Sequence, residues 1–263
     1  MEFTLSQIEH NYPKQVYILN NGFLNTLLTQ ISQSQTIQPL FNTLLTKVYN
    51  DLFTQILNNE WPTVATSVPT RMTEVHTDQK LNVTVFDEKQ KAVCVDIARA
   101  GMVPSQVIFD LVNYISKPEG IRQDHIFASR MTNQNNAVTH TCLQSSKIGG
   151  DVDDALVFLP DPMGATGSSL CEVISHYKNN IKGTAKRYIS VHLIVTPEFI
   201  KKVTATHPDA QIYAARVDRG FSNTDALEQI PGKLWDQEKG LNENQYIVPG
   251  AGGVGELINN SFV

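Results

Sequence analysis

The sequence predicts an α/β fold in which a parallel sheet is flanked by helices. Apolar residues make up 41% of the 263 positions, which is enough for one sizeable core. From residue 92 onward, short apolar runs alternate with amphipathic stretches, as expected of βα units whose strands lie parallel. We expect one domain over residues 1–263, with N-terminal helices and strands (about 1–90), a central core (about 91–221) and an insertion with a C-terminal segment (about 222–263).

The N-terminal part predicts two amphipathic helices and then strands. Apolar residues recur at helical spacing over Phe23–Leu57, with a break near Ser32–Thr36. After Trp61-Pro62 the residues favour β structure. The strands are expected at Val64–Val68, Leu81–Phe86 and Ala92–Ile97.

The central part continues the alternation of helices and strands. Helices are expected at Ser105–Ile115, Ser169–Asn179 and Pro197–Thr206, and strands at His125–Ala128, His140–Leu143, Leu156–Leu159, Tyr188–Val195 and Ala210–Ala215. Residues 222–245 are polar, with turn signals at Pro231-Gly232 and Lys239-Gly240, so we expect an irregular surface excursion there.

Charge and cysteine content exclude several classes of protein. The net charge is -5, with 21 Lys+Arg against 26 Asp+Glu, which argues against a nucleic-acid binder. Cys94, Cys142 and Cys171 have no metal-site spacing, and an odd number of separated cysteines fits a reducing compartment. No apolar run reaches the length of a membrane span, and residues 1–5 do not resemble a signal peptide. We therefore expect a cytoplasmic protein without a membrane partner.

The most informative segment is Asp161–Ser169, which follows the apolar strand Leu156–Leu159. Its small residues allow backbone N–H groups to converge on an anion, its hydroxyls add donors, and the helix that follows contributes a positive N-terminus. Asp161 itself suits a ribose hydroxyl or a positive charge that develops on a sugar. The plain alternative is a strand-to-helix turn that merely needs small residues.

Four segments resemble the uracil phosphoribosyltransferase family, in the family's order. Asp161–Ser169 is similar to its DPMxATGGS loop for phosphoribosyl pyrophosphate (PRPP), with Gly164 and Ser168 as departures. Tyr246–Gly255 resembles the YIVPGxGDxGD segment that binds uracil, Ile97–Val103 the LRAG stretch, and His125–Arg130 a strand that ends in arginine. The resemblance implies a phosphoribosyltransferase-like parallel sheet flanked by helices, with N-terminal helices and a C-terminal base-binding hood.

The resemblance also implies roles for individual residues. Arg99 and Arg130 would face the pyrophosphate of PRPP, where a planar guanidinium suits phosphate oxygens and stabilises the leaving group. Catalytic roles fall to Asp161 and Arg99. The residues expected to bind PRPP are Arg99, Arg130, Asp161, Pro162, Met163, Gly164, Ala165, Thr166, Gly167, Ser168 and Ser169, and those expected to bind uracil are Ile247, Gly252, Gly253 and Val254. Mg²⁺ would arrive with PRPP, bound mainly to its oxygens, and no separate protein metal site is expected.

Two departures from the family pattern affect these expectations. In the family an acid that contacts the PRPP ribose occupies the position of Gly253, and Glu256 is the nearest acid by sequence. The excursion over residues 223–244 is longer than the corresponding segment of typical bacterial members. Three roles are open for it: a lid, an interface element or a plain surface insertion.

The leading function is conversion of uracil and PRPP to UMP and pyrophosphate. The alternatives are transfer to another base, or a catalytically weakened nucleotide-binding regulator. A homo-oligomer is expected from the resemblance alone.

Overall fold

The computed structural model of the protein describes residues 3–132 and 138–261, without the side chains of residues 129–132 and 138–142. Its strands are β1 (Val16–Ile18), β2 (Thr63–Val68), β3 (Leu81–Phe86), β4 (Lys91–Ala98), β5 (Ile121–Thr132), β6 (Val138–Lys147), β7 (Ala155–Pro160), β8 (Met163–Gly164), β9 (Arg187–Val195) and β10 (Gln211–Val217). Its α-helices are α1 (Gly22–Ile31), α2 (Leu40–Glu60), α3 (Met102–Asn113), α4 (Ser168–Asn180), α5 (Pro197–Thr206), α6 (Thr224–Leu227) and α7 (Val254–Asn259).

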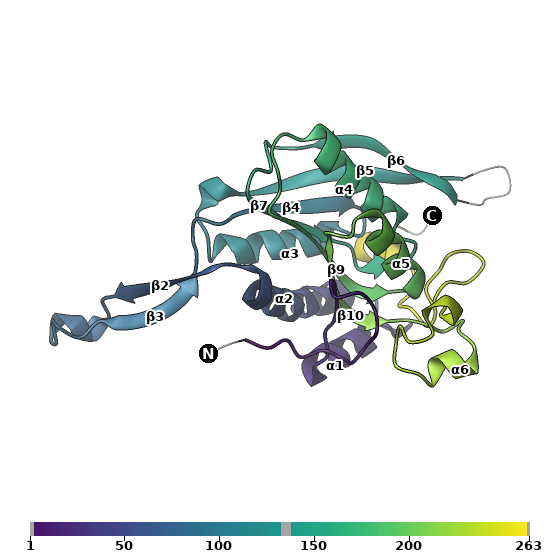
Figure 1. The fold of residues 1–263 in the computed structure, drawn as a ribbon, viewed down its shortest axis with the longest axis horizontal. Coiled ribbons are helices and arrows are strands. Elements are labelled where there is room, and N and C mark those ends of the chain that lie inside the picture. The colour runs from purple at the N-terminus through teal and green to yellow at the C-terminus, as the bar shows by residue number, and fades with distance from the viewer. Residues whose placement is uncertain (1–2, 133–137, 262–263) are drawn as a thin grey trace.

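The main sheet has the strand order β1-β10-β9-β7-β4-β5-β6, and the short strand β8 pairs with β9. All neighbours are parallel except β5 and β6, which are antiparallel. The carboxyl ends of β4 and β7 therefore lie at the same edge, where open α/β sheets place their ligands (Figure 1). Arg99 follows β4 and Asp161 follows β7 at this edge.

Helices cover both faces of this sheet. Buried residues of α1, α2, α3 and α7 form one apolar cluster with side chains such as Phe158 and Tyr213. Buried residues of α4 and α5 form the second cluster, with side chains such as Val157 and Val195. Because β7 contributes Phe158 to one cluster and Val157 to the other, its residues alternate between the two faces.

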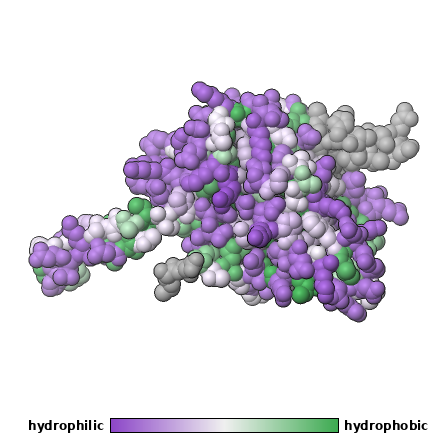
Figure 2. Space-filling model, viewed as in Figure 1, coloured by the Kyte–Doolittle hydropathy of each residue, from purple (hydrophilic) through white to green (hydrophobic). Residues whose placement is uncertain are grey.

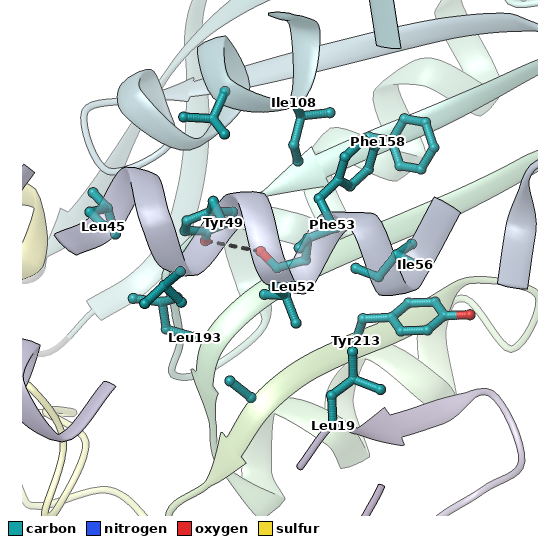
Figure 3. Close-up of a cluster of buried hydrophobic side chains, with 14 of the residues drawn as sticks. Leu19, Leu45, Tyr49, Leu52, Phe53, Ile56, Ile108, Phe158, Leu193 and Tyr213 are labelled. Carbon is teal, nitrogen blue, oxygen red and sulfur yellow. Dashed lines mark hydrogen bonds between the residues drawn. The ribbon is translucent and has the colours of Figure 1, made fainter. Parts of the chain in front are cut away.

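Helix α2 lies at the centre of the first cluster. Figure 3 shows its side chains with Ile108 of α3 and Phe158 of β7 on one side and Tyr213 of β10 on the other. The Phe53 ring meets Phe158 edge to face, with ring centroids 4.9 Å apart. The length of α2 follows from its unbroken helical spacing of apolar residues, all of which it buries except Leu40 at its start.

Strands β2 and β3 stand apart as a two-stranded antiparallel arm that projects from the body (Figure 1). The register places Val64, Thr66 and Val68 on one face, opposite Val85, Val83 and Leu81. Most of these apolar side chains are exposed, as are Met72 and Val75 between the strands. Figure 2 shows apolar residues along this arm.

The structure confirms the predicted fold class and most of the predicted elements. Three features differ from the sequence-based expectation. The segment after Gly253 forms helix α7, β6 runs antiparallel to β5, and β1 and β8 are short strands that were not expected. Among the described residues, no helix combines the length and the apolar character that a membrane crossing requires.

The long excursion over residues 223–244 is packed against the body. Glu238 is buried and accepts hydrogen bonds from the Tyr12 hydroxyl at 2.5 Å and from Arg219 Nη1 at 2.8 Å. Trp235 donates its indole N–H to the carbonyl of Pro197, at the start of α5. The sequence left three roles open for this excursion: a lid, an interface element or a surface insertion. Because the excursion is anchored to the body by these contacts, the structure favours a surface insertion.

Candidate active site

A cleft of about 540 Å³ opens at the carboxyl ends of β4, β5 and β7. It brings together all four segments singled out in the sequence. The predicted site residues that line it are Arg99, Asp161, Met163, Ala165, Ser169, Ile247, Gly252, Gly253 and Val254. None of residues 223–244 lines the cleft.

The loop Asp161–Ser169 leaves β7, adds the short strand β8 and enters α4. Within the loop, Pro162 and Gly164 are buried. These two residues do not line the cleft, and Thr166, Gly167 and Ser168 do not line it either. The backbone N–H groups of Thr166 and Gly167 have no acceptor among the described residues. The Ser168 N–H lies 3.4 Å from the Thr166 hydroxyl, at the start of α4. These groups fit an anion at the helix N-terminus.

Glycine is required at two positions of this loop. Gly167 has φ +77°, and a Cβ there would lie 3.0 Å from a methyl group of Val203. A Cβ on Gly164 would lie 2.8 Å from Val195 and 3.1 Å from the ring of Phe199. The backbone of the loop therefore packs directly against β9 and α5, and these contacts fix its position relative to the sheet.

Asp161 stands at the strand end, half-buried, and its Oδ1 accepts a hydrogen bond of 3.2 Å from the Met163 amide. Arg99 follows β4 on an exposed turn after the cis peptide Ala98-Arg99, and its Nη1 donates to the Ser261 hydroxyl. One carboxylate and one guanidinium thus face the same cleft. The pair can contact a sugar and a phosphate group at once.

Arg130 lies on β5, where it pairs with Thr141 of β6. Its side chain is outside the described part of the structure, so its expected contact with pyrophosphate stays a prediction. Ala128, two residues earlier on the same strand, lines the cleft.

The C-terminal segment is fixed to the end of β10 by an ion pair in which the carboxylate is buried and the guanidinium half-buried. Arg216 contacts both carboxylate oxygens of Asp218, at 2.6 and 2.9 Å. Asp218 accepts the Gly250 amide at 2.7 Å, while Arg216 donates to the Gly250 carbonyl at 3.0 Å. Gly250 has φ +64°, and a Cβ there would lie 2.3 Å from the Ile247 carbonyl oxygen. This clamp holds Ile247 and the glycines that follow against the cleft.

Glu256 occupies the space beside Gly253. A Cβ on Gly253 would lie 1.6 Å from Oε2 of Glu256. No hydrogen bond or ion pair reaches this carboxylate from residues 3–132 or 138–261. Glu256 lines the cleft and also a second cavity, of about 610 Å³, that lies between the C-terminal segment and the connection from α1 to α2. An acid is therefore present where the family pattern has one, supplied from three residues later.

Sequence reasoning missed several residues at this site. Phe127, Gln144 and Tyr246 line the cleft, and Arg216 and Asp218 clamp the C-terminal segment. Among these residues, only Arg216 and Asp218 could have been found from the sequence. They are two positions apart at the end of a strand, and alternate residues of a strand point to the same face, so their side chains are expected to meet.

The chain is similar to known proteins in sequence and in fold. The model of the uracil phosphoribosyltransferase family matches residues 18–233. The chain is similar in structure to the AQ2163 protein from Aquifex aeolicus, with 18% identity, 94% of this chain and 99% of that chain covered, and a TM-score of 0.70. A weaker likeness is to adenine phosphoribosyl transferase from Trypanosoma brucei, with 9% identity, 86% and 96% coverage and a TM-score of 0.49.

The family match covers most of the chain, including Arg99 and the loop Asp161–Ser169, and ends before the segment Tyr246–Gly255. The fold of the first similar structure extends over nearly the full length. The chain belongs to the uracil phosphoribosyltransferase family, and its class of reaction is phosphoribosyl transfer.

Proposed function

We propose that this phosphoribosyltransferase joins uracil to PRPP and releases UMP and pyrophosphate, a step of pyrimidine salvage. One observation carries the proposal: a single cleft holds the loop residue Asp161, Arg99 and the C-terminal segment from Ile247 to Val254. A loop for a 5′-phosphate, a cation for a leaving group and a backbone surface for a base are thus adjacent.

In the proposed reaction, N1 of uracil attacks C1′ of PRPP as the bond from C1′ to the pyrophosphate oxygen breaks. The N1 proton leaves with solvent, and the bonding electrons leave with pyrophosphate. Arg99 would stabilise the negative charge that grows on the leaving group. Asp161 would hold the ribose hydroxyls and face the positive charge on the sugar. The Thr166 and Gly167 amides would hold the 5′-phosphate.

Uracil would be read largely by main-chain groups of the C-terminal segment. Gly252 has φ +73° and open space where a Cβ would be, so its backbone is accessible to a flat ligand. Ile247 and Val254 are buried beside it and offer apolar contacts. The family match does not reach this segment, and the base is therefore the point that most needs an experiment.

We propose that Mg²⁺ enters bound to PRPP. Among the described residues no group of three or more His, Cys, Asp or Glu side chains could hold a metal ion. Two carboxylates, Asp161 and Glu256, line the cleft and fit an ion whose other ligands are pyrophosphate oxygens and water. When bound, the ion would neutralise charge on the leaving group.

The test is pyrophosphate release from PRPP with uracil, cytosine, thymine, hypoxanthine and orotate offered separately. We expect turnover with uracil and little with the others. Turnover with another base would assign that base instead, an alternative that the changed C-terminal segment leaves open. Binding of PRPP without turnover on any base would indicate a nucleotide-binding regulator.

We also propose that the chain forms a homo-oligomer through the β2–β3 arm. An isolated two-stranded hairpin is only marginally stable in water, and this one exposes an apolar face that includes Val64, Val85 and Leu81. A second copy that buries this face would stabilise it. The Val64→Glu variant should then sediment as a smaller species than the wild type, whereas an equal size would contradict the proposal.

The proposed location is the cytoplasm. Cys94 and Cys171 are free thiols, as expected in a reducing compartment, and burial raises the pKa of both. Detection of the tagged full-length chain in a secreted or membrane fraction would contradict this.

A further inference from the structure

We propose that His192 and Thr196 are positioning residues, which hold the two ends of the loop segment Asp161–Ala165 so that the Thr166 and Gly167 amides just beyond it are free for phosphate. This inference rests on the proposed function, because it concerns how the same loop binds the 5′-phosphate of PRPP. Neither residue lines the cleft, so each acts through the loop that it holds.

Every backbone carbonyl of the segment has a donor. The three central ones are held by main-chain N–H groups. Leu193 and Ile194 donate to the Pro162 carbonyl at 3.1 Å each, Ala165 to that of Met163 at 2.9 Å, and Thr196 to that of Gly164 at 3.1 Å. The bonds from Leu193, Ile194 and Thr196 continue the pairing of β8 with β9, and the bond from Ala165 is local to the loop; all of them use main-chain donors and so do not depend on particular side chains.

The two terminal carbonyls are held by side chains. Nδ1 of His192 lies 2.6 Å from the Asp161 carbonyl oxygen, and Oγ1 of Thr196 lies 2.6 Å from that of Ala165. Both donors come from β9 or the residue just after it. The Asp161 N–H also donates to the Val191 carbonyl at 3.0 Å, so what depends on the identities of His192 and Thr196 is the position of the two terminal carbonyls.

His192 is suited to this role because its ring is neutral. It is fully buried, and this burial lowers the pKa of its imidazole to about 4, against a smaller opposing effect of the bond to Asp161. A carbonyl oxygen only accepts, so Nδ1 carries the proton and donates. Nε2 has no partner among the described residues, and the ring packs edge to face on Phe199. Within the described part of the chain, the one hydrogen bond that the ring makes is therefore the one to the loop.

Thr196 links the loop to helix α5. Its hydroxyl donates to the Ala165 carbonyl and accepts the Phe199 amide at 3.0 Å, as the N-cap of α5. The next two amides along the chain, those of Thr166 and Gly167, are the ones that have no acceptor in the described residues. If the Ala165 carbonyl were released, it could rotate toward the phosphate and repel it. The contact with Thr196 therefore keeps a negative dipole away from the anion.

The decisive experiment compares His192→Leu with His192→Asn in the full chain. Leu fills more of the ring's volume and removes the unpartnered Nε2, but it cannot donate. Asn can place an N–H near the position of Nδ1, but it leaves a cavity beside Phe199. Stability should therefore favour Leu and loop positioning should favour Asn, which separates the two roles.

The probe is ribose 5-phosphate, whose affinity is measured by titration calorimetry without any turnover. We expect His192→Leu to bind it about three- to tenfold more weakly than the wild type, the usual effect of one lost hydrogen bond, and His192→Asn to retain most of the affinity. The KM for PRPP should follow the same order, while the KM for uracil stays constant.

Thr196 has its own pair of variants. Thr196→Val should weaken ribose 5-phosphate binding by a similar factor, and Thr196→Ser should restore it. Ser190→Ala is the control within β9, since the Ser190 hydroxyl bonds to the Gln211 carbonyl, away from the loop. Asn223→Ala removes the N-cap of α6 and controls for the loss of a helix cap.

The inference is overturned if affinity for ribose 5-phosphate follows the melting temperature across these variants, or if His192→Leu and His192→Asn bind alike. The proposed function fails in a different way, when the wild type binds ribose 5-phosphate but releases no pyrophosphate with any base. In that case the order of affinities would still support the positioning roles.

Discussion

Restoring the family acid should harm this enzyme, because Glu256 already fills its place. Gly253 has φ −79°, so an aspartate can adopt its backbone conformation. Its Cβ, however, would lie 1.6 Å from Oε2 of Glu256 and 2.7 Å from Cδ. The glutamate side chain can turn aside, so the fold should survive, but two carboxylates would then share one site. Two such charges about 4 Å apart repel by about 1 kcal/mol in water and about 4 kcal/mol at an effective dielectric of 20.

The cycle of Gly253→Asp, Glu256→Gln and the double variant tests this reasoning. Glu256→Gln keeps the shape of the side chain and loses a charged hydrogen bond of about 1.5–3 kcal/mol, so the KM for PRPP should rise about ten- to a hundredfold. Gly253→Asp alone should also raise it, through repulsion. The double variant should come back toward the wild type, because the introduced aspartate then stands alone.

The assay is pyrophosphate release at varied PRPP and fixed uracil, with Glu243→Gln as a control, since Glu243 is exposed and does not line the cleft. The KM for uracil should hardly change in any of these variants. If Glu256→Gln leaves the KM for PRPP unchanged, Glu256 does not contact the ribose, and the reasoning fails.

Three further predictions concern the loop, the leaving group and pH. Arg99→Ala should lower kcat and kcat/KM together at an unchanged melting temperature, because Arg99 is exposed and its partner charge grows during the reaction; normal turnover with early melting would make it structural. Gly167→Ala should weaken binding of inorganic phosphate, because φ is +77° and the new Cβ would lie 3.0 Å from Val203; unchanged affinity in calorimetry would argue against a built anion site. His192 has a pKa of about 4 when folded and near 6.5 when unfolded, so the unfolded chain binds more protons between these values. The free energy of unfolding should therefore fall as pH drops from 6.5 to 4, by up to roughly 3 kcal/mol, and fall less in His192→Leu when both are measured by urea titration.

The regular core of the fold could be predicted because its signals are local. Helix α5 begins and ends where the sequence places it, since Thr196 caps it, Pro197 occupies its first turn and its apolar residues follow helical spacing. Helix α7 was missed because Gly252, Gly253 and Gly255 suggested an irregular end. Tertiary packing overrides that preference by burying Val254 and Ile258 in the first cluster.

Long-range relations could not be predicted in this way. The direction of β6 depends on its neighbour β5, and no local pattern in the sequence encodes it. The loop and Arg99 were found because family motifs mark them. The sequence placed His192 within the apolar strand Tyr188–Val195, but it could not say that the imidazole donates to the carbonyl of Asp161. The Arg216–Asp218 clamp was missed for the same reason.

The clamp on Gly250 has a consequence for engineering. Arg216 and Asp218 contact only the N–H and C=O of that residue, and both of their side chains belong to β10 and the residue just after it. Further along, α7 is held from the side of α2, where Gln38 and Asn42 donate to the carbonyls of Leu257 and Ile258. Under the proposed function, a designer who wishes to change the accepted base can therefore vary positions 252, 253 and 255, provided that a glycine stays at position 250 and the buried Ala251 and Val254 stay apolar, and leave the phosphate loop untouched.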